Sequence, residues 1–169
     1  MLGTIALYGT AWLALAFWAW SQWLRRPGSA RLAWTAGCLA NLLHILLAFH
    51  LVHHWDHALA RAAVARHTYE QTGLDSGIGL YINYAFAALW LIDTICWWLY
   101  PPRPCSDPQF YRRRARWLDG VIQIIFLFMF FNATVVFGKS PIRLVGALFC
   151  FWGALGWYKA TRESAQHNL

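Results

Sequence analysis

Long runs of apolar residues, each about as long as a helix that crosses a bilayer, recur along this chain. A helix needs roughly 20 such residues to span a hydrocarbon core about 30 Å thick. Because lipid offers the backbone no hydrogen-bond partner, isolated spanning segments are α-helices. The sequence predicts five spans, at residues 2–24, 32–52, 78–100, 117–137 and 142–158.

The composition agrees with a membrane location. Of 169 residues, 59% are hydrophobic and only 12% are charged, a balance too apolar for a soluble domain of this size. Short Gly- and Pro-containing connections separate the runs, without a linker or an internal repeat. We therefore expect an all-α integral membrane protein, a bundle of five transmembrane helices forming one domain over residues 1–169, in the inner (cytoplasmic) membrane of a bacterium.

The basic residues predict the orientation, because cytoplasmic connections carry an excess of Lys and Arg. One side of the five-span arrangement holds ten of the 14: Arg25, Arg26, Arg31, Arg103, Arg112, Arg113, Arg114, Arg116, Lys159 and Arg162. The other side holds Arg61, Arg66, Lys139 and Arg143. The N-terminus is therefore predicted outside and the C-terminus in the cytoplasm, with anionic lipid headgroups as partners of the basic side. No nucleic-acid motif accompanies these residues, so no nucleic-acid partner is expected.

Histidines are concentrated at the predicted outer end of the second span. Four lie within eight residues: His50, His53, His54 and His57. On a helix, this spacing of i, i+3, i+4 and i+7 places all four imidazoles on one face. Helix-favouring residues continue to Thr72 without Gly or Pro, so the second span is expected to extend beyond the membrane, or to bend there and lie on its surface.

Such a face is suited to holding a metal ion. Neutral imidazole is a common metal ligand, and His50 with His54, like His53 with His57, has the i, i+4 spacing that chelates one ion. The predicted function is a metal-binding membrane protein engaged in redox chemistry or metal handling. Copper, zinc and iron all accept these ligands. The candidate ligands are completed by His67, with Asp56, Glu70 and Asp75 as additional ligands or as groups that orient the imidazoles.

A second class of function is open for the same residues. The chain is also compatible with an accessory transmembrane subunit of a larger respiratory, photosynthetic or monooxygenase complex. Its histidines would then contact a partner subunit, haem or chlorophyll, or form a polar, pH-responsive face at the membrane surface. The sequence assigns no catalytic residue and leaves open whether the protein is an enzyme.

His44 is a separate candidate within the second span. It lies about 9 Å of helix rise from His50 and on the opposite side of the helix from His53. Ionisable groups inside a membrane are usually functional, so His44 is a candidate ligand of haem or chlorophyll. The alternative is a neutral histidine that hydrogen-bonds to Asn41 or to another span, for example through Asn132.

The segment from His50 to His54 also resembles one histidine box, HxxHH, of the membrane-bound di-iron fatty acid desaturases and hydroxylases. The resemblance covers five residues. It implies a short oxidase in which His44, His67 and carboxylates complete the ligand shell. That family uses several such boxes, usually facing the cytoplasm, whereas this chain has one, predicted to face outward. The sequence therefore does not assign the chain to that family.

Overall fold

The protein is a bundle of α-helices. The computed structural model describes residues 2–100, 103–104, 111–112, 115–136 and 142–166. Its elements in chain order are α1 (Leu2–Ser21), α2 (Pro27–Leu51), α3 (His57–Thr72), α4 (Ile78–Leu99), β1 (Arg103–Pro104), β2 (Tyr111–Arg112), α5 (Arg116–Phe131), the π-helix η1 (Asn132–Val136) and α6 (Ile142–Gln166). The two-residue strands form an antiparallel pair, with Arg103 opposite Arg112.

Local chemistry determines several of the helix ends. Pro27 opens α2, where its fixed φ suits the first helical turn and its missing N–H costs no hydrogen bond. Gly73 closes α3 with φ of 75°, a left-handed conformation that glycine adopts without strain. The last turn of α5 widens into η1, where the Thr134 side chain lies against Gly146 of α6. The absence of a side chain at Gly146 is what lets these two helices approach.

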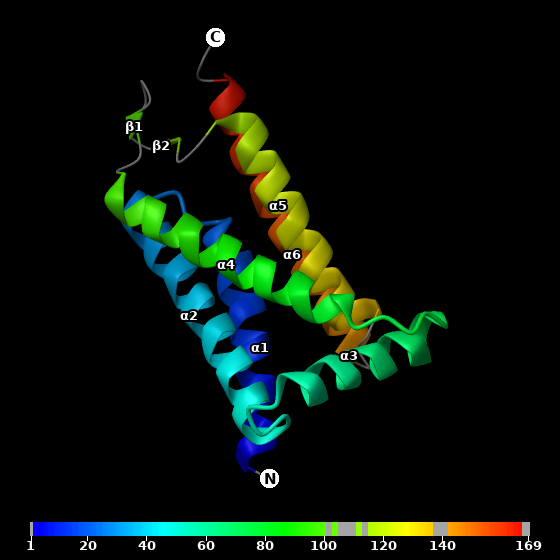
Figure 1. The fold of residues 1–169 in the computed structure, drawn as a ribbon. Helices are drawn as coiled ribbons and strands as arrows, with labels where there is room; N and C mark the ends of the chain where they lie inside the picture. Colours follow the sequence, from blue (N-terminus) through cyan, green and yellow to red (C-terminus); the bar gives the residue numbers. More distant parts are fainter. Residues whose placement is uncertain (1, 101–102, 105–110, 113–114, 137–141, 167–169) are drawn as a thin grey trace.

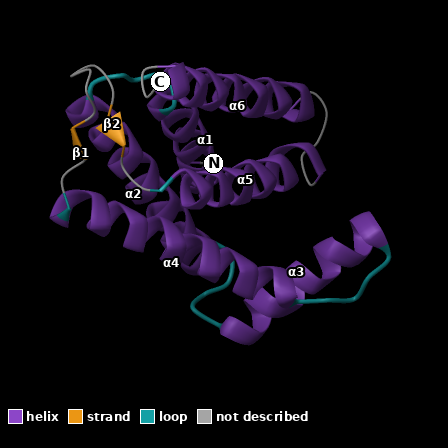
Figure 2. Cartoon of the chain, turned by 90° about the horizontal axis from the view of Figure 1, so that it is seen from above, coloured by secondary structure: helices purple, strands orange, loops and turns teal. Residues whose placement is uncertain are grey.

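The helices are arranged as two hairpins joined by a crossing helix. Figure 1 shows α1 and α2 side by side, and α5 beside α6. α4 runs along α2 and reaches α5, while α1 also contacts α6. α3 leaves the end of α2 sideways and lies against the start of α4, at the margin of the molecule (Figure 2).

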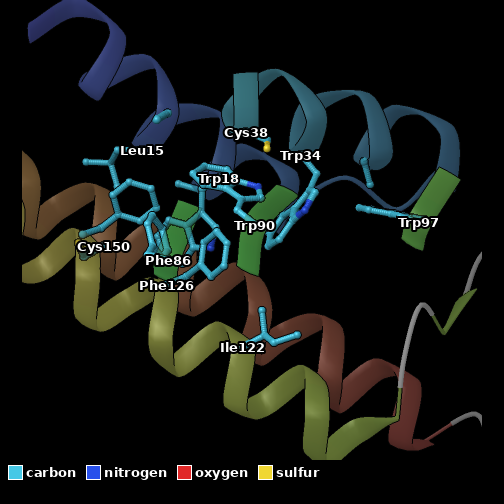
Figure 3. Packing of buried hydrophobic residues seen from close by; sticks show 14 residues of the cluster. Leu15, Trp18, Trp34, Cys38, Phe86, Trp90, Trp97, Ile122, Phe126 and Cys150 are labelled. Carbon is cyan, nitrogen blue, oxygen red and sulfur yellow. The ribbon is translucent and has the colours of Figure 1, made fainter. Parts of the chain in front are cut away.

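Aromatic rings form the centre of the bundle (Figure 3). Phe126 of α5 is fully buried, and its ring centre lies 4.8 Å from those of Trp34 on α2 and Trp90 on α4. The indole N–H of Trp18 on α1 donates to Oε1 of Gln123 over 3.1 Å, so α5 is also tied to α1. Each such ring pair contributes about 0.5–1.5 kcal/mol beyond its buried area.

Within the described residues, three helices are long and apolar enough to cross a membrane: α2, α4 and the continuous helix Trp117–Val136 that α5 and η1 form. This is consistent with the predicted class, an all-helical integral membrane protein. The predicted limits were close, although α2 begins at Pro27, earlier than expected, and α6 continues to Gln166, well past residue 158. The end of the fourth predicted span, residue 137, lies outside the described residues.

The prediction that the second span extends beyond the membrane as one straight helix is wrong; the chain bends after it, as the alternative had proposed. α2 ends at Leu51, and α3 starts as a separate helix at His57. Between them His54 and Trp55 have φ of 49° and 63°, which no right-handed helix contains. The prediction that the four histidines share one helical face is therefore wrong as well.

Two interactions explain this break. The carboxylate of Asp56 accepts hydrogen bonds from the backbone N–H groups of Ala58, over 2.7 Å, and Leu59, over 3.1 Å, and thereby starts a new helix. The side chains of Arg61 and Val64 then pack against Gly77 and Gly79 at the start of α4. A straight continuation of α2 would lose this tertiary contact, whereas the break leaves the alanines of residues 58–65 helical within α3.

Two glycines in different environments test the packing of the bundle. A Cβ at Gly37 would lie 2.7 Å from the Trp90 ring, whereas Gly9, in the interior of α1, has open space around it. We expect Gly37→Ala to lower stability by about 1–3 kcal/mol through overpacking. Gly9→Ala should raise it by up to about 1 kcal/mol through helix propensity. Reversible unfolding in mixed micelles, followed by circular dichroism, measures both, and equal effects would contradict the packing described.

Candidate functional site

The end of α2, the turn after it and the starts of α3 and α4 meet in one cluster of rings. We call this cluster the histidine corner. Its members are Phe49, His50, His53, Trp55, His57, Tyr81 and Tyr84. Three of the four clustered histidines thus come together here, although through a turn rather than along a helix.

A pair of rings, Phe49 of α2 and Tyr84 of α4, forms the wall of the corner, with centres 6.2 Å apart. The imidazole of His53 packs on Phe49 with ring centres 5.7 Å apart. The imidazole of His57 packs on Tyr84 at 6.1 Å and on Tyr81 at 5.8 Å. Imidazoles from both sides of the turn therefore contact the same aromatic wall.

The corner is open to its surroundings on its other side. Trp55 is 61% exposed and its ring lies 6.3 Å from that of His50, which is also exposed. His53 is half-buried, and His54 is exposed in the left-handed conformation. Two consecutive non-glycine residues with positive φ store backbone strain, which is found preferentially where function requires a particular side-chain placement.

Asp56 has a structural role in this arrangement. Its Oδ1 caps α3 through both of the hydrogen bonds described above. From the sequence, Asp56 was predicted to be a metal ligand or a group that orients an imidazole. The structure uses it to position His57 at the first position of α3.

The remaining predicted ligands lie away from the corner. His67 follows His57 by about 15 Å of helix rise, and its Nδ1 lies 3.7 Å from the carboxylate of Glu70. Asp75 lies in the turn after α3 and lines a hollow there with Arg66 and Tyr69. The structure therefore does not bring His67, Glu70 or Asp75 to the four clustered histidines.

Within the described residues, no group of three or more His, Cys, Asp or Glu side chains is placed so that it could hold one metal ion. The imidazoles of the histidine corner therefore pack on its aromatic rings and are not converged on one point. Its exposed side chains have room to change rotamer.

His44 has a hydrogen-bond partner that the sequence did not predict. Its Nδ1 lies 2.9 Å from the backbone carbonyl oxygen of Leu7 on α1. Because a carbonyl only accepts, Nδ1 carries the proton that it donates to Leu7. This bond corresponds to the structural alternative for His44, with α1 in place of Asn41 or Asn132 as the partner.

The opposite end of the bundle carries basic side chains in fixed contacts. Arg25, after α1, pairs with Glu163 near the end of α6 over 3.0 Å. The guanidinium of Arg31, in the first turns of α2, lies 4.0 Å from the ring centre of Trp98 at the end of α4. Basic residues of the first connection and the C-terminal segment thus share one end, and the histidine corner lies at the other.

The two tyrosines of the histidine corner were not predicted from the sequence. Tyr81 and Tyr84 stand at i, i+3 in the first turns of α4, a spacing that places two side chains on one helix face. Nothing in the sequence indicated that this face meets Phe49 and His57, because the contact depends on the turn between α2 and α3.

Comparisons of the chain with models of known families, with curated proteins and with solved structures find no match.

The capping role of Asp56 can be tested by substitution. Asp56→Ala should destabilise α3 by about 1 kcal/mol, since two N–H groups of its first turn lose their acceptor. Hydrogen exchange followed by mass spectrometry should show roughly fivefold faster exchange in α3, with α1 unchanged. Asp56→Asn keeps an acceptor oxygen and should exchange like the wild type; equal exchange in the Ala variant would contradict the capping role.

Proposed function

We propose that this is a five-span membrane protein with its N-terminus outside, in which α1 and α6 cross the membrane together with α2, α4 and the α5–η1 helix. α1 and α6 contain 20 and 25 residues, enough for about 30 Å or more of rise. Large apolar side chains face outward on both, including Ile5 and Leu13 on α1 and Leu144 and Phe151 on α6. Lipid tails would cover these side chains, which would be unfavourable in water.

The orientation rests on the separation of the two ends. The end that joins Arg25 and Arg31 to α4 and α6 is the basic one, and a basic end favours the cytoplasm and its anionic headgroups. The histidine corner would then lie at the outer surface of the membrane.

Reporter fusions test this topology. Alkaline phosphatase fused after Thr72 should be active in a bacterial host, since it folds only outside the cytoplasm, and fused after Gln166 it should be inactive. Green fluorescent protein at the same two positions should give the reverse pattern. Reversed activities would contradict the orientation. Equal activities at both positions would contradict the three spans proposed between Thr72 and Gln166.

The proposed activity of the corner is binding of one transition metal ion. The observation that carries this proposal is that His53 and His57, from opposite sides of the turn, both pack on the Phe49–Tyr84 wall. His50 and His54 are exposed beside them, and their side chains can rotate towards an ion held there. Rotation of these side chains would bring the imidazoles to one ion, which imidazole coordinates through its unprotonated nitrogen.

The donor set indicates the kind of metal. Imidazole nitrogen suits copper, zinc and iron, whereas calcium and magnesium require several oxygen ligands. Asp56, the carboxylate nearest in sequence, already uses Oδ1 to cap α3. A site of imidazoles backed by aromatic rings therefore favours a borderline transition metal over a hard cation.

Metal titration of the purified full chain, stripped by a chelator, tests this proposal with Zn²⁺ and Cu²⁺. His53→Ala and His57→Ala should each weaken binding by at least about tenfold, because removing a ligand costs no less than removing a group that orients one. His67→Ala is the matched control, since His67 lies at the far end of α3, and it should bind like the wild type. Absence of stoichiometric metal in the wild type, or equal affinity in all variants, would refute the site.

A role as an accessory subunit is the second candidate, and the exposed ring of Trp55 favours it. Large aromatic side chains at a surface are typical anchors of protein interfaces. If the wild type binds no metal and Trp55→Ala abolishes a complex that His53→Ala preserves, the corner is a surface that contacts another membrane protein.

A further inference from the structure

Apart from the histidine corner, α3 and the turn after it form an open hollow on the surface. A hollow of about 330 Å³ is lined by Ala62, Ala65, Arg66, Tyr69 and Asp75. The two alanines leave space beside the helix, and charged groups of opposite sign stand within the same hollow. Arg66 and Asp75 form no ion pair with each other in the part of the chain that the structure describes.

The other charged residues of α3 and its flanking turns lie outside the hollow and have contacts of their own. Asp56 caps the helix, Glu70 lies beside His67, and the stem of Arg61 packs on Gly77. Arg66 and Asp75 therefore remain as one positive and one negative group facing a common space. Three carboxylates against two arginines in residues 56–77 also distinguish this end from the basic end.

We propose that this hollow binds a zwitterion of the phosphoethanolamine type, with a phosphate on Arg66 and an ammonium group on Asp75. A guanidinium binds phosphate oxygens through paired hydrogen bonds. The ammonium group donates to the carboxylate of Asp75 and lies near the ring of Tyr69, a cation–π partner. An anionic molecule without an ammonium group would leave Asp75 as a repulsive neighbour.

The surroundings of the hollow fit a lipid as the source of this group. Leu74 and Ile78, on either side of Asp75 in the chain, are 65% and 63% exposed. Acyl chains attached to a bound headgroup would cover such side chains. A free phosphoethanolamine would satisfy the same charged groups without covering them, so an experiment distinguishes the two sources.

Native mass spectrometry of the full chain in detergent, with metal removed, tests the proposal independently of the histidine corner. The lipids are dioleoyl phosphatidylethanolamine and dioleoyl phosphatidylglycerol. The wild type should retain the former about fivefold more than the latter, and Arg66→Gln and Asp75→Asn should each reduce that preference by about threefold or more, the range of exposed charge pairs. Glu70→Gln and Arg26→Gln are matched controls, one on α3 outside the hollow and one at the opposite end.

Equal retention of the two lipids by the wild type, or a preference that survives both substitutions, would overturn the proposal. Competition with soluble phosphoethanolamine identifies the source. Displacement of the lipid at comparable concentrations would support a free zwitterion as the ligand, and resistance to displacement would support the lipid, whose acyl chains add to the binding.

Discussion

The packing of Phe126 against both Trp34 and Trp90, whose own ring centres lie 5.7 Å apart, is the interaction on which the arrangement of the bundle depends. It joins α5 to both α2 and α4, which otherwise belong to different parts of the chain. Within a lipid environment apolar side chains gain little by leaving the solvent, so close packing contributes more of the stability than burial does. Gly37 and Gly146 contribute to that packing, because each leaves space for a neighbouring side chain.

Once α4 is held against α2, the position of the histidine corner follows. The start of α4 brings Tyr84 to the end of α2, and Tyr84 is a ring against which His57 and Phe49 pack. α3 is anchored by the same helix, through Gly77 and Gly79. The turn with two strained residues is therefore stabilised from both sides. Strain of this kind persists only where surrounding contacts require it.

The two ends of the bundle differ in chemistry. One end holds arginines in an ion pair and a cation–π contact, and the other holds imidazoles, aromatic rings and a nearly balanced set of charges. Such a difference is what the two faces of a membrane with unlike surface charge would favour. The proposed metal site and the proposed headgroup site both lie at the less basic end, and they use different side chains of α3 and its turns.

The class of the protein and most helix limits were accessible from the sequence, because apolar runs of membrane length and turn residues act locally. The concentration of histidines before Thr72 was equally plain. The arrangement of the histidines could not be predicted from the sequence. Local signals from Ala and Arg predict a continuous helix, whereas Asp56 and the contacts of Arg61 with Gly77 favour a break. The ring partners of His57, Tyr81 and Tyr84, lie more than 20 residues away in the chain.

The sequence by itself therefore determined an α-helical chain with apolar runs of membrane-spanning length, a histidine-rich connection and a biased distribution of basic residues. Only the tertiary structure decided which imidazoles meet, that His44 bonds to α1, and that His67 stands apart from the corner. The physical reason is that periodicity and composition describe one segment at a time. A site built at a junction of three helices depends on how those helices pack.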